Sequence, residues 1–163
     1  MGHGKLGLRK PGHRELAEPQ AAVNGSAIAR ARSGELAKRR PRLLVVEDEA
    51  IAALMMEQTL IALGYEVCDV VDSEAGALEA AEKHCPDLIL MDIRLAGGGD
   101  GIRAAAKARD RLSIPSIFTT AHSDAATLAR AEGAKPVGFL LKPYSRAQVR
   151  DALAHAIDLI REG

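Results

Sequence analysis

From Arg42 onward the chain alternates short apolar runs with longer stretches of helical pattern, and this alternation constrains the fold more than any other feature. It is typical of βαβ units, in which helices join parallel strands. Such connections are nearly always right-handed, so successive units place helices on both faces of one sheet. Five units fit this part of the sequence. They predict an α/β sandwich with a central parallel sheet.

The expected strands cover residues 43–46, 65–71, 87–91, 115–119 and 137–141, and the expected helices cover residues 50–63, 73–84, 101–111, 123–133 and 145–161. Gly64 can take the left-handed conformation that ends many helices, and Pro86 prevents the second helix from continuing. Residues 88–91 are all apolar, which indicates a central strand covered by helices on both faces.

The first 42 residues differ in kind from the rest. They hold ten basic and three acidic residues, a charge of +7, and the remaining residues carry −7. Because few large apolar residues offset the entropy of ordering, we expect residues 1–41 to be a basic, mostly disordered extension of a domain spanning 42–163. Gly34 interrupts a transient helix from Ser26 to Lys38. The extension is suited to an acidic partner, to the domain's own acidic face or, weakly without aromatic residues, to nucleic acid.

Composition excludes several classes of protein. Cys68 and Cys85 are the two cysteines, too few for a disulfide framework or a four-ligand zinc site. No stretch approaches the roughly 20 apolar residues that span a bilayer, and the N-terminus lacks the apolar core of a signal peptide. We therefore expect one soluble, cytoplasmic domain with no membrane contact.

Polar side chains follow four of the expected strands. Glu47 and Asp48 follow the first, Asp92 ends the third, Thr120 follows the fourth and Lys142 follows the fifth. The carboxyl ends of parallel strands meet at one edge of the sheet, where ligands bind in such folds. Each residue alone has a structural explanation, such as a helix cap. Together they predict a functional site, with Asp92 as its reactive group.

This set of side chains suits phosphoryl transfer. Three neighbouring acids repel one another unless a cation is bound or some are protonated. Carboxylate oxygens select a hard ion such as Mg²⁺, which also accepts phosphate oxygens. Lys142 would supply a mobile positive charge and Thr120 a hydroxyl donor, so the Asp92 carboxylate could attack a phosphoryl group in line.

The sequence resembles the receiver domain of two-component response regulators over Arg42 to Ile160. The resemblance is carried by four motifs in order: Val45-Val46-Glu47-Asp48-Glu49, Leu90-Met91-Asp92-Ile93-Arg94-Leu95, Thr119-Thr120-Ala121-His122 and Gly138-Phe139-Leu140-Leu141-Lys142-Pro143-Tyr144. It implies a flavodoxin-like (βα)5 fold with strand order 2-1-3-4-5. It also implies a signalling domain that catalyses its own phosphorylation and dephosphorylation and is not otherwise an enzyme.

The resemblance implies a role for each motif residue around the metal. A histidine kinase or phosphotransfer protein would donate a phosphoryl group from its histidine to Asp92. Asp48 and Asp92 would ligate Mg²⁺ directly, the backbone carbonyl of Arg94 would be a third ligand, and Glu47 would hold metal-bound water.

The resemblance also implies a conformational switch. Thr120 and Lys142 would hold the phosphoryl oxygens, and the bond between Lys142 and Pro143 would be cis. Thr120 would move inward on phosphorylation, and Phe139 would rotate into the space it leaves. The change would be read on the face of the domain's fourth helix, fifth strand and fifth helix, by a partner protein or a second copy of the chain.

The chain departs from the commonest receiver pattern in the loop after Asp92. A proline often stands four residues after the acceptor, where this chain has Ala96 in a glycine-rich loop that is one residue longer. We expect this loop to be looser. Phe139 also lacks the hydroxyl of the tyrosine that many receivers carry. Arg94 and His122 each lie two residues past a site residue, and we hypothesise that they shield or orient the attacking water. The alternative is that both are ordinary solvated side chains.

Two other classes of protein fit these residues less well. A hydrolase of the haloacid dehalogenase type needs an acid two residues after its nucleophile, where this chain has Arg94, which cannot donate a proton at neutral pH. A flavodoxin-like flavin binder needs a phosphate-cradling loop where Glu47-Asp48-Glu49 would repel phosphate. Because the last helix ends beside Gly163, we expect a stand-alone receiver. Its output would be a partner, a homodimer through the last two helices, or the draining of phosphate from another receiver.

Overall fold

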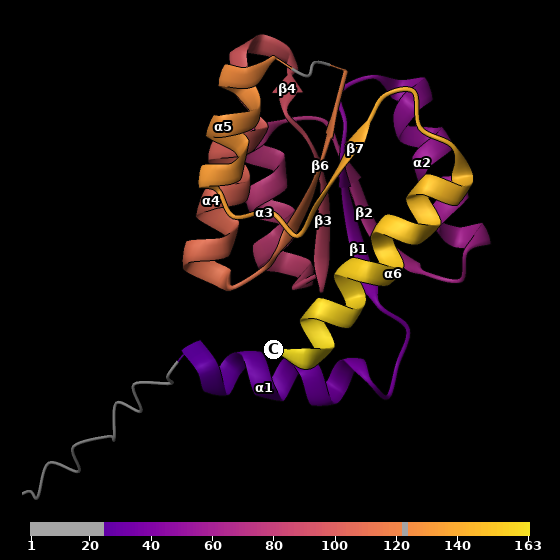
Figure 1. Cartoon of the computed structure of the whole chain (residues 1–163), viewed down its shortest axis with the longest axis vertical. Helices are drawn as coiled ribbons and strands as arrows, with labels where there is room; N and C mark the ends of the chain where they lie inside the picture. The colour runs from indigo at the N-terminus through magenta and orange to yellow at the C-terminus, as the bar shows by residue number, and fades with distance from the viewer. Residues whose placement is uncertain (1–24, 122–123) are drawn as a thin grey trace, which may run out of the picture.

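The computed structural model describes residues 25–121 and 124–163. The strands of its main sheet are β1 (Arg42–Val46), β2 (Glu66–Val71), β3 (Leu88–Asp92), β6 (Ser116–Thr120) and β7 (Gly138–Leu141). The helices are α1 (Gly25–Leu36), α2 (Ala50–Ala62), α3 (Glu74–His84), α4 (Gly101–Leu112), α5 (Ala125–Gly133) and α6 (Arg146–Glu162). The sheet is parallel with order β2-β1-β3-β6-β7 and has helices on both faces (Figure 1), which confirms the predicted fold.

Each strand and helix expected from residue 42 onward is present, with ends within two residues of the prediction. The helix expected from residue 123 begins at Ala125, and residue 123 itself lies outside the described residues. Ser73 caps α3 by accepting a hydrogen bond from the Gly76 N–H at 3.0 Å. Gly64 follows α2 with φ of 92°, the left-handed conformation predicted for it. Among the described helices, none has the length and apolar content needed to cross a membrane.

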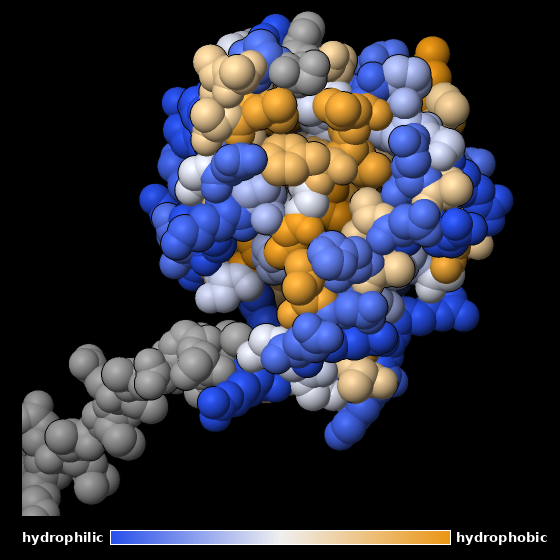
Figure 2. Space-filling view, viewed as in Figure 1, coloured by the Kyte–Doolittle hydropathy of each residue, from blue (hydrophilic) through white to orange (hydrophobic). Residues whose placement is uncertain are grey.

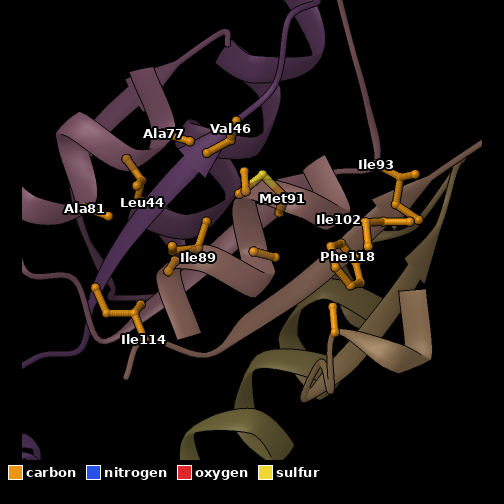
Figure 3. Packing of buried hydrophobic residues seen from close by; sticks show 14 of the residues in the cluster. Leu44, Val46, Ala77, Ala81, Ile89, Met91, Ile93, Ile102, Ile114 and Phe118 are labelled. Carbon is orange, nitrogen blue, oxygen red and sulfur yellow. The ribbon is translucent and has the colours of Figure 1, made fainter. Parts of the chain in front are cut away.

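The inner strands β1, β3 and β6 are buried on both faces, and their alternate residues point to opposite sides of the sheet. Leu43 and Val45 belong to the cluster that contacts α2 and α6. Leu44 and Val46 belong to the other cluster, which includes alanines of α3 and α4. Figure 3 shows Leu44 and Val46 packed in this second cluster with Ala77, Ala81, Ile89 and Met91. β3 lies at the centre of the sheet, as its continuous apolar run predicted.

A docked helix occupies part of the segment that we expected to be mostly disordered. α1 crosses beneath the C-terminal end of α6 (Figure 1), and Leu36 near its end is 1% exposed. The Ser33 hydroxyl donates to the Ile160 carbonyl at 2.8 Å, and Arg32 Nη1 donates to the Ser113 carbonyl at 3.1 Å. These bonds satisfy carbonyls at the ends of α6 and α4 that no turn of their own helix can reach. The expectation of disorder was therefore wrong for residues 25–36, and residues 1–24 lie outside the described residues.

A buried carboxylate fixes the segment between α1 and β1. Asp87 stands just before β3 and is 6% exposed. Its two oxygens accept hydrogen bonds from Arg39 Nη1 at 2.8 Å and Nη2 at 2.9 Å, and Oδ2 also accepts from the Arg42 N–H at 2.7 Å. Paired, two-point contacts of this kind are among the strongest side-chain interactions. Arg39 therefore binds an acid of the domain itself, one of the three partners considered for the basic extension.

The loop after Asp92 contains a short hairpin that the sequence did not predict. β4 (Arg94–Leu95) pairs antiparallel with β5 (Gly99–Asp100), and a single 3-10 turn, η1 (Ala96–Gly98), joins them. Gly97 and Gly98 have φ of 69° and 77°, a left-handed backbone conformation that residues with a side chain rarely adopt. The extra glycine residues thus allow the chain to reverse within three residues.

Two carboxylates attach this hairpin to three helices. Glu74 of α3 accepts a hydrogen bond from the Asp100 N–H at 3.2 Å and from Arg103 Nε and Nη2 at 2.6 and 2.7 Å. The bond from Arg103 lowers the pKa of Glu74 to about 2. The Asp100 side chain caps α4 and also pairs with Arg130 of α5. These contacts tie the Asp100 end of the loop to α3, α4 and α5. That the loop is looser than in other receivers stays a prediction.

The first residue of α4 lies directly against the backbone of Asp92. The Gly101 N–H donates to the Ile93 carbonyl at 3.0 Å. A Cβ added to Gly101 would lie 1.8 Å from the Asp92 carbonyl oxygen, 2.9 Å from the Asp92 carbonyl carbon and 3.1 Å from the Ile93 Cα. Because all three atoms belong to the backbone, no side-chain rotation relieves the contact. Only glycine fits between α4 and the end of β3.

We expect Leu36→Ala to release α1 from the domain, because it removes a wholly buried side chain that joins α1 to the core. Truncation of a buried leucine costs about 2–5 kcal/mol. Hydrogen exchange measured by mass spectrometry should show faster exchange across residues 25–36. Glu35→Ala, an exposed neighbour on the same helix, is the matched control and should leave exchange unchanged. Equal protection of α1 in wild type and Leu36→Ala would contradict its docking through Leu36.

We expect Gly101→Ala to destabilise the domain, because its Cβ would displace the Asp92 backbone. Inserting atoms into closely packed structure costs about 1–3 kcal/mol, and urea unfolding would measure it. Gly133→Ala is the control. It lies in α5 with no atom within 4 Å of the added Cβ, so the higher helix propensity of alanine should leave stability equal or raised. A Gly101→Ala variant as stable as wild type would show that α4 can shift without cost.

Candidate functional site

Four adjacent strands bring the predicted site residues to one edge of the sheet. Glu47 and Asp48 directly follow β1, and Asp92 is the last residue of β3. Thr120 ends β6, and Lys142 directly follows β7. Strand register aligns these ends, because Val46 pairs with Met91, Asp92 with Thr119, and Thr120 with Leu141. The site therefore forms where parallel strands end together.

Glu47, Asp48 and Asp92 form a cluster in which one carboxylate oxygen of each lies within 4.8 Å of the others. Glu47 is 6% and Asp92 is 7% exposed, whereas Asp48 is exposed to solvent. Burial raises the pKa of Glu47; the hydrogen bond from Lys142 works against this rise, and the charge of Asp92 adds to it. Two buried acids and one exposed acid thus face a common point.

Lys142 reaches both buried acids. Its Nζ lies 2.8 Å from Glu47 Oε2 and 3.1 Å from Asp92 Oδ2. Burial lowers the pKa of Lys142, but hydrogen bonds to the two carboxylates outweigh this effect and raise the pKa above its ordinary value. Lys142 is therefore cationic at neutral pH. The peptide bond between Lys142 and Pro143 is cis, as the resemblance implies.

Backbone N–H groups orient the two buried carboxylates. The Glu49 N–H donates to Glu47 Oε1 at 3.2 Å, and the Arg94 N–H donates to Asp92 Oδ1 at 3.2 Å. In each carboxylate, the backbone holds one oxygen and Lys142 holds the other. An open groove of about 490 Å³ lies beside the cluster and is lined by Asp48 together with residues of α2 and β2. The acids are therefore fixed in place and open to solvent on the side of Asp48.

Thr120 and Phe139 lie beside the cluster on neighbouring strands. Thr120 is 2% exposed, and Phe139 is partly buried against the core on the α3 and α4 side of the sheet. The Phe139 ring packs on the Phe118 ring with centroids 5.9 Å apart and planes tilted by 39°. Because Thr120 is two residues beyond Phe118 on the same strand, its side chain points to the same face of the sheet.

Of the two residues hypothesised to affect the lifetime of the phosphoryl group, the structure describes only Arg94. Arg94 is exposed. Its charge contributes to a lowered pKa of Asp124, the cap of α5, after the larger effect of hydrogen bonds from Thr127. His122 lies outside the described residues.

Sequence reasoning missed two features that position Asp92. One is the close contact of Gly101 with the Asp92 carbonyl, and the other is the attachment of the hairpin to Glu74. The pair Asp100-Gly101 suggested a helix cap, and nothing local indicated that the glycine abuts β3. Glu74 stands in the first turn of α3, where an acid is common for the helix dipole alone.

The donor set of the cluster fits a hard divalent cation. Mg²⁺ is held by one or two carboxylates, by waters and by phosphate oxygens. Glu47, Asp48 and Asp92 offer carboxylate oxygens only, and one of them faces solvent. Lys142 Nζ is bonded to Asp92, so its positive charge stands where it can pair with phosphate oxygens. The arrangement is chemically suited to a phosphoryl group bound between Asp92, a cation and Lys142.

Comparison with known proteins identifies the family of the chain. Residues 43–154 match the family model of the response regulator receiver domain. The transcriptional regulatory protein PdtaR of Mycobacterium tuberculosis is 33% identical over 121 residues, which cover 74% of this chain and 58% of PdtaR. The phyllosphere-induced regulator PhyR of Methylorubrum extorquens is 31% identical over 116 residues, which cover 71% of this chain and 43% of PhyR. The chain spans a little over half of the first relative and less than half of the second.

Solved structures show the same fold. A signal receiver domain of a modulated diguanylate cyclase from Desulfovibrio desulfuricans has a TM-score of 0.72 and 34% identity, over 76% of this chain and 98% of that one. A CheY-like receiver domain from Methanospirillum hungatei has a TM-score of 0.70 over 77% of this chain and 100% of that one, and its 23% identity supports the fold alone. Fold, motifs and family model agree, and the chain belongs to the receiver domain family of response regulators.

Proposed function

We propose that this receiver accepts a phosphoryl group on Asp92 from the histidine of a kinase or phosphotransfer protein, with Mg²⁺ as cofactor. The observation that carries the proposal is the position of the Asp92 carboxylate. It ends the central strand, lies within 4.8 Å of oxygens of Glu47 and Asp48, and is bonded to Lys142 Nζ at 3.1 Å. Receiver domains are signalling domains, and this geometry supplies the parts that phosphoryl transfer requires.

In the proposed reaction, one oxygen of Asp92 attacks the phosphorus in line with the bond to the donor's ring nitrogen. The O–P bond forms, the P–N bond breaks, and the nitrogen leaves with the electron pair. Asp92 Oδ1 is held by the Arg94 N–H, so Oδ2 is the attacking oxygen in this arrangement. Lys142 can then shift its hydrogen bond from Oδ2 to a phosphoryl oxygen, because a lysine stem is flexible.

The acid cluster holds the cofactor in this proposal. When bound, Mg²⁺ neutralises charge on the phosphoryl oxygens as the new bond forms. Asp48 and Asp92 are its direct ligands with the backbone carbonyl of Arg94, and Glu47 holds metal-bound water. Glu47 is suited to that outer position because its Oε1 is already bonded to the Glu49 N–H and its Oε2 to Lys142.

The exposed start of α2 is the proposed docking surface for the phosphoryl donor. Ile51 is 70%, Leu54 is 54% and Met55 is 65% exposed, an unusual density of apolar side chains on an open helix face. α2 begins two residues after Asp48, and Leu54 also lines the groove beside the cluster. A donor seated on this surface would bring its histidine to the acidic edge.

The output surface in this proposal is formed by α5, β7 and α6. Phosphorylation draws Thr120 toward the phosphoryl group, and Phe139 moves inward with it. Phe139 lies on β7 beside Leu141, which is 53% exposed. Figure 2 shows apolar side chains gathered over β7 between α5 and α6. A downstream protein or a second copy of the chain would bind this face. Arg94 and His122 are proposed to affect the lifetime of the phosphoryl group.

We expect Asp92→Asn to abolish phosphorylation by acetyl phosphate with Mg²⁺, because an amide oxygen cannot replace the attacking carboxylate. Intact-mass spectrometry should show one phosphoryl addition in wild type and none in the variant. Hydroxylamine should remove the addition, as it does for acyl phosphates. Asp110→Asn, which alters an exposed carboxylate on α4, is the control and should label as wild type does. Equal labelling of wild type and Asp92→Asn would contradict the assignment.

We expect Asp48→Asn to weaken Mg²⁺-dependent labelling without unfolding the domain, because Asp48 is the exposed acid of the cluster. Changes around metal ligands cost roughly tenfold or more in metal affinity. The measurement is the initial labelling rate over a range of Mg²⁺ concentrations. Glu49→Gln is the matched control, since Glu49 is the next exposed acid and lies outside the cluster. Unchanged Mg²⁺ dependence in Asp48→Asn would contradict the ligand assignment.

A further inference from the structure

α5 is packed more weakly than the other helices that cover the sheet. Ala131 is the one buried residue among its nine, whereas α2 and α3 each bury three residues, α6 buries four and α4 buries five. In Figure 1 it lies at the left edge of the domain. A helix with so little buried surface depends on its few polar contacts for its position, and elements that move in switches are of this kind.

One ion pair joins α5 to the hairpin beside Asp92. Arg130 Nη2 donates to Asp100 Oδ2. Among the described residues, no other side-chain hydrogen bond or ion pair joins α5 to another element. Asp100 is the cross-strand partner of Arg94, whose N–H holds Asp92 Oδ1 at 3.2 Å. α5 is therefore attached to the pair of strands that orients the acceptor carboxylate.

Asp100 is itself fixed by α3 and α4. Its Oδ1 accepts hydrogen bonds from the Ile102 and Arg103 N–H groups at 3.0 and 3.2 Å and so caps α4. Its own N–H donates to Glu74 Oε2 at 3.2 Å. Its Oδ2 is bonded to Arg130. Because α3 and α4 hold Asp100, a movement of α5 has to break the ion pair rather than carry Asp100 with it.

The start of α5 closely follows the proposed switch residue. Thr120 ends β6, and the four residues 121–124 connect it to Ala125. In the proposed function, Thr120 moves toward the phosphoryl group, and this short connection passes the displacement to α5. Arg130 lies in the last turn of the helix, where Asp100 holds it. α5 is thus connected at its start to a part that moves and near its end to a part that does not.

We propose that the ion pair between Asp100 and Arg130 is a latch that holds α5 in its resting position, and that phosphorylation of Asp92 opens it. The trigger rests on the proposed function, whereas the latch does not. The Arg130 side chain is 57% exposed and that of Asp100 is 18% exposed. An ion pair of this kind changes an opening equilibrium by only about two- to fivefold. Such a contact can be broken by a modest movement at the site.

The latch is tested by hydrogen exchange of residues 125–133 in the full chain without a phosphodonor. Arg130→Gln and Asp100→Asn should each speed this exchange by about two- to fivefold. Asparagine still caps a helix, so exchange in α4 should stay as in wild type. The double variant should exchange no faster than the faster single variant, because both changes remove the same contact. Unchanged α5 exchange in Asp100→Asn, or effects of the two changes that add, would overturn the latch.

Two control variants alter neighbouring charges outside the ion pair. Glu132→Gln changes an exposed residue of α5, and Asp110→Asn changes an exposed carboxylate of α4. Both should leave exchange of residues 125–133 as in wild type. Arg130 also favours the C-terminal end of the α5 dipole, so the response to Asp100→Asn, outside α5, separates the latch from an effect on the helix alone. An acceleration as large in Asp110→Asn as in Asp100→Asn would contradict the latch.

The trigger is tested by the same measurement after treatment with acetyl phosphate and Mg²⁺, with the labelled fraction read from the intact mass. Phosphorylation should speed exchange of residues 125–133 in wild type and add little in Asp100→Asn, in which the latch is already open. Equal acceleration in both, or none in labelled wild type, would overturn the trigger. A wild type that is not labelled would contradict the proposed function together with the trigger, whereas the single and double variants still decide the latch.

Discussion

The burial of two acids beside one lysine is the constraint on which the site depends. Oxygens of Glu47 and Asp92 lie within 4.8 Å of each other, where two unit charges repel by roughly 3 kcal/mol at the effective dielectric of a protein. Lys142 offsets this repulsion by bonding both at once. The three residues stand at the ends of three different strands, so their contact requires the sheet order and register to be correct. A site of this kind is stable only in the complete fold, and it attracts any further cation that can reach it.

The fold, and which residues form the site, were predictable because each strand and helix end is indicated by a pattern of residues that are neighbours in sequence. The apolar run 88–91 identifies β3 without reference to any other residue, and parallel pairing then determines where its end must lie. Glu47, Asp48, Asp92 and Lys142 were placed together by that topological rule, and the structure has them in contact or within 4.8 Å. Gly64 and Ser73 could be assigned as helix ends because capping depends on neighbours in sequence.

What the sequence could not predict depends on contacts between distant residues. Leu36 lies in a polar, basic segment, and its burial requires the end of α6 as a partner. Arg39 is one of several arginines near residue 40, and nothing local distinguishes it as the one that reaches Asp87. Gly101 is one of fifteen glycines, and its necessity follows from the Asp92 carbonyl that lies against it. Propensity and periodicity contain no information on such pairs.

Asp87 and Asp92 stand at the two ends of β3, and their hydrogen bonds explain why the first has a structural role and the second is suited to react. Asp87 precedes the strand and Asp92 ends it, and both are nearly buried. Asp87 receives three hydrogen bonds of 2.7 to 2.9 Å, from a two-point arginine and a backbone N–H, so its acceptor capacity is largely filled. Asp92 receives two longer bonds of 3.1 and 3.2 Å, one of them from a flexible lysine. An ionised carboxylate has about four acceptor positions, so Asp92 keeps more free capacity than Asp87, and its longer bond to Lys142 is also the more easily displaced. The same strand thus uses one carboxylate to anchor its beginning and leaves the other available at its end.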